Sequence, residues 1–137
     1  MTAKEYLQQY KDADRLAQRL KKEYEKELDL IDSLRSAANT DGMPRGGGRS
    51  KPTEIKAVKL ADKMTEYQEA EYEAIRVKRR VLKTINMIQG ECGEVLYERY
   101  INFKSWSEVA EAVGYTKRHC FNLHLEALDQ VEKILRR

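Results

Sequence analysis

The apolar residues of the first forty positions recur at alternating steps of three and four residues, a spacing that forms a continuous stripe on an α-helix. The stripe consists of Ala3, Tyr6, Tyr10, Ala13, Ala17, Leu20, Tyr24, Ile31, Leu34 and Ala38. Four further leucines widen it: Leu7, Leu16, Leu28 and Leu30. Because a wide stripe needs more than one neighbour to cover it, we expect a helix of about ten turns packed against several partners.

A second stripe of the same kind follows position 53. It consists of Ala57, Leu60, Met64, Tyr67, Ala74, Val81, Ile85 and Ile88. Thr53 suits the N-cap of this helix, and we expect Gly90 to end the helix or at least to let the chain bend. The two helices predict an antiparallel hairpin over residues 1–90 that retains apolar surface for a partner. We expect that partner to be a second copy, in a homodimer.

The segment 39–52 separates the two stripes. It holds four of the seven glycines and both prolines, residues that disfavour a continuous helix, so we expect a flexible loop. Arg45, Arg49 and Lys51 make this loop basic. Two interpretations remain open, a solvated connector or an arm that contacts DNA phosphates.

The composition excludes several classes of protein. Charged residues make up 36% of the 137, as is typical of long surface helices. Cys92 and Cys120 are too few for a disulfide scaffold and lack the close spacing of a zinc site. No apolar run approaches the ~18 residues that span a bilayer, and we find no export signal, so we expect a cytoplasmic protein without a membrane segment.

Residues 91–137 predict a trihelical DNA-binding domain, the second domain of the chain. Ser105 and Glu108 match a capping box that starts a short helix, with Trp106, Val109, Ala110 and Val113 on its inner face. Gly114 supplies the left-handed conformation of a sharp turn, and Thr116 is placed to cap the next helix. We expect Tyr115 to turn inward, and Cys120 and Leu123 to dock the second helix on the first. This register is typical of a helix-turn-helix.

The outer face of the second helix predicts the DNA contacts. It presents Thr116, Lys117, Arg118, Phe121 and Asn122, side chains that suit base edges, thymine methyl groups and phosphates of a major groove. Arg79, Arg80, Lys83 and Lys104 are further candidates for phosphate contacts, although a basic run on a helix is more often a solvated face. Residues 91–137 carry seven Lys and Arg against eight Asp and Glu, so any affinity for DNA must come from local clustering of positive charge.

The residues show no sign of enzymatic chemistry. No glycine loop follows a strand, no nucleophile stands with a base, and carboxylates do not cluster in a plausible pocket, so we expect neither an enzyme nor a cofactor. His119 and His124 lack acidic or cysteine partners at ligand spacing, so we expect no metal site.

Residues 94–135 resemble region 4 of bacterial sigma factors. The likeness lies in Val-Leu-Tyr-Glu-Arg-Tyr at 95–100, Ser-Trp-Ser-Glu-Val-Ala at 105–110, Gly-Tyr-Thr-Lys-Arg at 114–118 and Leu-Glu-Ala-Leu at 125–128. With its N-terminal hairpin, the whole chain is similar to small phage and prophage proteins related to the ArpU and RinA late-transcription regulators.

The resemblance implies transcriptional control of phage genes in a bacterial host cell, through double-stranded DNA near promoters and contact with RNA polymerase. It does not imply a complete sigma factor, because nothing here resembles the region that melts the −10 element. The alternative is a coiled-coil adaptor whose trihelical end binds a protein instead of DNA.

Overall fold

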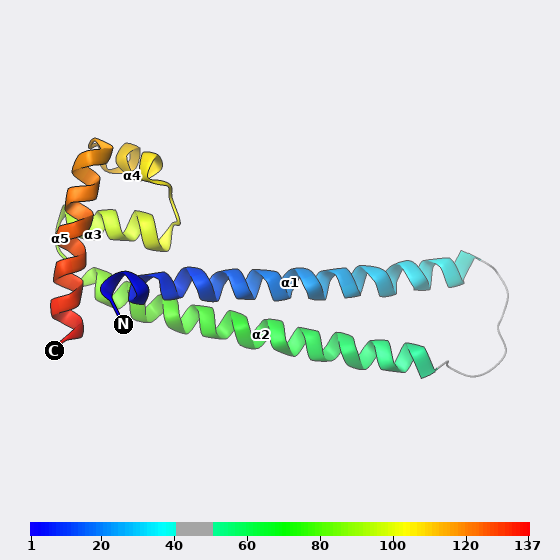
Figure 1. Ribbon diagram of the computed structural model, residues 1–137. Helices are drawn as coiled ribbons and strands as arrows, with labels where there is room; N and C mark the ends of the chain where they lie inside the picture. The colour runs from blue at the N-terminus through cyan, green and yellow to red at the C-terminus, as the bar shows by residue number, and fades with distance from the viewer. Residues whose placement is uncertain (41–50) are drawn as a thin grey trace. The chain divides into compact units, whose positions relative to one another are not determined.

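The computed structural model describes residues 1–40 and 51–137, and this part of the chain is helical without a strand (Figure 1). The elements are α1 (Ala3–Thr40), α2 (Lys51–Asn86), α3 (Glu91–Leu96), the π-helical turn η1 (Tyr97–Ile101), α4 (Trp106–Val113) and α5 (Lys117–Leu135). The predicted fold is confirmed: a long antiparallel helical hairpin precedes a C-terminal helix-turn-helix region.

The helices of the hairpin reach further than the sequence predicted. α1 continues to Thr40, and α2 already begins at Lys51, so Thr53 lies inside a helix and the prediction that it is the N-cap was wrong. Residues 41–50 lie outside the described residues, and with them the predicted contacts of Arg45 and Arg49. The two interpretations of this segment therefore stay open.

The chain packs as two compact units, and their boundary differs from the predicted division after residue 90. One unit, here called the core unit, joins Met1–Asp14 to Glu73–Arg137, and the other, the hairpin unit, is Arg15–Tyr72. The reason is hydrophobic: Ala3 and Leu7 of α1 belong to the same buried cluster as Val81 of α2 and Val95 of α3. The start of α1 and the end of α2 thus pack with the C-terminal helices.

The hairpin unit has a thin core. Of its described residues, Ala17 is buried, whereas Leu20, Tyr24, Leu60 and Tyr67 are half-buried. The rings of Tyr24 and Tyr67 stack with centroids 6.1 Å apart, and the Lys63 ammonium lies 3.9 Å from the Glu23 carboxylate. Leu16, Leu30 and Leu34 remain exposed, because two helices alone cannot cover the full width of the stripe.

The connection between α2 and α3 is a tight turn. The amides of Met87 and Ile88 bond back to the carbonyls of Thr84 and Ile85, which closes α2 four residues before Gly90. Gly90 has a φ of 77° and directly precedes α3, so it bends the chain, as one of the two predicted alternatives proposed. A Cβ on Gly93 would lie 2.3 Å from the Ile88 carbonyl oxygen, so this glycine permits α3 to pack closely against the turn.

We predict that Leu7→Ala destabilises the folded protein by about 2–5 kcal/mol, the usual loss when a buried leucine leaves a cavity. The Leu7 side chain is 0% exposed, whereas Leu16 on the same helix is 42% exposed. Leu16→Ala is therefore the matched control, with an expected loss below about 1 kcal/mol. Urea denaturation followed by circular dichroism measures both, and equal losses would contradict the position of Leu7 in the core.

Candidate nucleic-acid interface

The local structure of the helix-turn-helix follows the sequence closely. Ser105 caps α4 in a capping box, with its hydroxyl accepting from the Glu108 amide at 3.3 Å. Gly114 ends α4 in the left-handed conformation, with φ 79°, where a Cβ would be strained. The Thr116 hydroxyl accepts from the His119 amide at 3.2 Å and starts α5. These predicted start and stop signals are confirmed.

The prediction for Tyr115 was wrong. Its side chain is 38% exposed rather than turned inward, and its hydroxyl donates to the Glu91 carboxylate at the start of α3. Its ring meets the His119 ring edge-on, with centroids 4.7 Å apart. The phenol hydroxyl needs a hydrogen-bond partner, and the Glu91 carboxylate at the surface provides one. Through this bond Tyr115 connects the turn after α4 to the start of α3.

The inner face of α5 holds this helix against the rest of the core unit. Cys120, Leu123, Ala127 and Val131 are buried in the common core. His124 is buried among them, and its Nε2 lies 2.7 Å from the Tyr100 hydroxyl of η1, in hydrogen-bond contact. This bond and the apolar face together fix the rotation of α5 about its axis, which determines the side chains that face outward.

A pair of aromatic rings packs the N-terminal part of α5 against α4. The ring of Phe121 packs on Trp106 of α4, with centroids 4.5 Å apart, and the Arg99 guanidinium lies 4.8 Å from the Trp106 ring centroid. Arg99 also donates to the Lys104 carbonyl at 2.8 Å. Phe121 is still 44% exposed, so one part of its ring is packed and another part is open to solvent.

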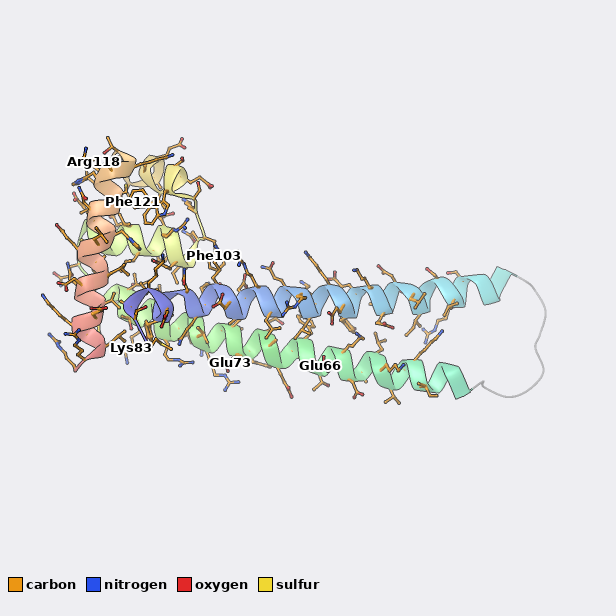
Figure 2. The ribbon with its side chains drawn as sticks, viewed as in Figure 1. Glu66, Glu73, Lys83, Phe103, Arg118 and Phe121 are labelled. Carbon is orange, nitrogen blue, oxygen red and sulfur yellow. The ribbon has the colours of Figure 1, made fainter. Side chains whose placement is uncertain are left out.

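The predicted DNA-reading residues lie together on the first turns of α5. Thr116, Lys117, Arg118, Phe121 and Asn122 are all exposed, and Figure 2 shows Arg118 and Phe121 near the N-terminal end of this helix. The first turn of α5 contains no acidic residue. Two cations next to the positive end of the helix dipole are unfavourable for the isolated helix but suit a bound anion.

The charge of α5 changes along its length. After Asn122 the exposed positions include Glu126 and Asp129, and Asp129 pairs with Lys133 at 3.2 Å. Carboxylates repel anions, so the first two turns are the part of α5 whose charge suits an anion. Glu111 is exposed on α4, which makes that helix a poor phosphate contact.

The second predicted set of basic residues is separate from the first. Arg79, Arg80 and Lys83 are exposed near the end of α2, and Figure 2 shows Lys83 well apart from Arg118. Arg80 lies 3.8 Å from Glu73. Lys104 is paired with Glu98 at 2.6 Å, and its hydrogen bond to that carboxyl is the main cause that lowers the pKa of Glu98. The structure does not bring these four residues into one site with the start of α5.

One supporting contact was missed in the sequence. Phe103, between η1 and α4, has a φ of 57°, unusual for a residue with a side chain. Its ring lies 5.1 Å from the ring of Tyr10 on α1, and the Lys78 ammonium lies 5.7 Å from the Tyr10 centroid. A turn with positive φ is usually recognised in a sequence by a glycine, and here the residue is a phenylalanine. The contact with Tyr10 could therefore be recognised only in the folded structure.

We predict that acid weakens the fold through His124. Burial, together with the positive charges of Lys4 and Arg99, lowers the pKa of His124 from 6.5 to about 4. Between pH 6.5 and pH 4 the unfolded chain therefore takes up a proton that the folded chain does not, and stability falls as the pH falls, by roughly 2–3 kcal/mol. Urea denaturation from pH 7.5 to pH 4 measures this loss.

His124→Gln is the matched variant, since glutamine has no charge to gain over this range. Carboxylates also titrate near the acid end, so the informative quantity is the difference between the slopes of the two proteins. A wild-type slope no steeper than that of the variant would contradict the pKa shift.

Searches for a metal site, for a membrane-spanning helix and for similar proteins were all negative. Among the described residues, no group of three or more His, Cys, Asp or Glu side chains could hold a metal ion. None of the described helices is apolar enough over a sufficient length to span a membrane. Comparison of the chain with protein-family models, with curated proteins and with solved structures found no match.

Proposed function

We propose that this chain binds double-stranded DNA through the first two turns of α5. The observation that carries the proposal is the N-terminus of this helix, where Lys117 and Arg118 are exposed and the first turn has no acidic residue. The free amides and dipole of a helix N-terminus attract phosphate, and exposed Lys and Arg add to that attraction.

The side chains beyond the first turn suit base edges. Arg118 and Asn122 are one helical turn apart and lie opposite the buried face formed by Cys120, Ala127 and Val131. In a major groove, Arg pairs with guanine, Asn with adenine, and the open part of the Phe121 ring can meet a thymine methyl group. Because α5 is rigidly docked by its inner face, these groups are held ready for a duplex.

The biological role proposed for this interface is transcription regulation. Its support is the resemblance of residues 94–135 to region 4 of sigma factors and of the whole chain to phage late-transcription regulators. The proposal includes action in the cytoplasm of a bacterial host, as a homodimer that contacts RNA polymerase at the promoter.

A second candidate function, a protein adaptor, is favoured by the apolar exposure of the same helix. Phe121 is 44% exposed and Leu125 is 64% exposed, and exposed Glu111 on α4 would repel a DNA backbone. Large apolar side chains on a surface are typical of protein interfaces.

We predict that Arg118→Ala weakens specific DNA binding by about 1–3 kcal/mol, because a base contact or a phosphate contact is lost. Arg118 is exposed, so the free energy of unfolding should stay within about 0.5 kcal/mol of wild type. Arg136 just after the other end of α5 is also exposed, and Arg136→Ala is the matched control. The binding site would first be selected from a pool of randomised duplexes, and dissociation constants would then be measured at several salt concentrations.

The two candidate functions give opposite results in this assay. DNA binding predicts that the selected duplex binds with a steep salt dependence and that Lys117→Glu with Arg118→Glu abolishes it. No salt-sensitive binding of any selected duplex would overturn the proposal. The adaptor function predicts instead that no selected duplex binds with this salt dependence, while purified bacterial RNA polymerase is still retained equally well by the wild-type chain and by the charge-reversed chain.

A further inference from the structure

The hairpin unit exposes a row of leucines on α1. Leu16 is 42% exposed, Leu30 is 49% exposed and Leu34 is 46% exposed. A half-buried leucine and two glutamates complete the row, here called the leucine seam, which consists of Leu16, Leu20, Glu23, Glu27, Leu30 and Leu34. All six residues belong to the hairpin unit, so the seam lies on one helix of one compact unit.

The leucine seam follows one side of α1. At 100° per residue, its six positions fall within an arc of about 80°. The more buried face of this helix, with Ala17 and Tyr24, is centred about 90° further round, and Tyr24 stacks there on Tyr67 of α2. The seam is therefore a second apolar surface, beside the face of α1 that packs on α2.

The order of residues in the seam is the same in both directions. Successive members are four, three, four, three and four residues apart, with two leucines at each end and the two glutamates in the middle. This is the heptad spacing with which one helix packs its side chains between those of another. A helix that carries the same seam in the reverse direction therefore matches it layer by layer.

We propose that α1 pairs along the leucine seam with α1 of a second copy, with the two helices antiparallel. A two-fold axis at position 25 sets Leu16 opposite the partner's Leu34 and Leu20 opposite the partner's Leu30. Each of these pairs occurs twice in the dimer, because the two copies contribute the same surface. The exposed leucines at both ends of the seam thereby become buried.

The charges at the centre of the seam are balanced in this pair. Glu23 faces the partner's Glu27, and two carboxylates alone would repel each other. In each copy, however, the Lys63 ammonium lies 3.9 Å from the Glu23 carboxylate. Exposed Lys26 borders the seam between the two glutamates. The dimer therefore brings four ammonium groups to four carboxylates.

The polar centre also fixes the register of the pair. A shift by one heptad would place Glu23 and Glu27 against leucines and leave their charges in an apolar layer. The antiparallel direction follows from the second helix of each hairpin. A two-fold axis perpendicular to α1 leaves both α2 helices on the same side, so that four helices form a bundle, whereas parallel α1 helices would leave them on opposite sides.

This pairing assigns a surface to the homodimer of the proposed function. It rests on that homodimer and does not require that α5 contacts DNA. Self-association is measured without DNA, so the failure of one proposal leaves the other standing. A protein of a different kind would have to match both the apolar ends and the charged centre of the seam, whereas a second copy matches each layer with its own kind.

Sedimentation equilibrium of the full chain over a range of concentrations tests the surface. We expect wild type to dimerise and Leu30→Lys to raise the dissociation constant at least about tenfold, because an ammonium then lies among leucines twice in each dimer. Val58→Lys is the matched control. Val58 is 61% exposed and lies about 180° round α2 from half-buried Tyr67, so this change should leave association unaltered.

Disulfide cross-linking tests the direction. Leu16→Cys and Leu34→Cys, combined in one chain, should join two copies under mild oxidation, because each cysteine faces the other kind across the pair. Neither variant alone should cross-link, since the two copies of position 34 lie about 27 Å apart along the helices, far beyond the ~7 Å between Cα atoms that a disulfide spans. Wild type, in which Cys92 and Cys120 are buried, is the background control on the non-reducing gel.

The outcomes separate the possible arrangements. A monomeric wild type, equal effects of Leu30→Lys and Val58→Lys, or cross-linking of Leu34→Cys alone would each overturn the antiparallel pairing. Circular dichroism of each variant establishes that a loss of association is not a loss of folding. Below the dissociation constant of the dimer Leu16 stays exposed, so the stability comparison of Leu7→Ala with Leu16→Ala is made at that concentration.

Discussion

The burial of one face of α5 determines the rest of the core unit. Cys120, Ala127 and Val131 are each 0% exposed, in the same hydrophobic cluster as Leu7 at the start of α1. The hydrogen bond between His124 and Tyr100 adds a directional contact within this apolar surface. Because these contacts fix both the position and the rotation of α5, they also decide that Arg118 and its neighbours face solvent.

The parts of the fold that depend on local chemistry could be predicted from the sequence. Ser105, Gly114 and Thr116 each satisfy a requirement of the adjacent backbone, a cap or a left-handed turn, and the structure has all three as expected. The two long helices could be predicted in the same way, because the spacing of their apolar residues along the sequence follows the helical repeat. The class of the fold and the candidate DNA-reading face follow from these local signals.

The parts that depend on distant contacts could not be predicted. Tyr115 was expected inside, yet its hydroxyl finds Glu91, twenty-four residues earlier. The contact of Phe103 with Tyr10 joins residues more than ninety positions apart. The positive φ of Phe103 could not be predicted either, because phenylalanine rarely adopts it. The division of packing likewise follows from Leu7, whose place in the core is decided by helices that the sequence alone does not position.

Charge is distributed unevenly along α5. Its first turn has basic residues and no acidic one, an arrangement that attracts an anion. Exposed Glu126 and Asp129 follow further along the same helix. An overall charge of +3 does not reveal this local arrangement.

Mapping of backbone amide shifts by nuclear magnetic resonance, during titration with the selected duplex, tests the central claim most directly. The account predicts that the largest shift changes fall at residues 116–122, with small changes from residue 126 to the end of α5. Large changes confined to α2 or to the second half of α5, with residues 116–122 unaffected, would contradict the claim that the N-terminus of α5 contacts DNA.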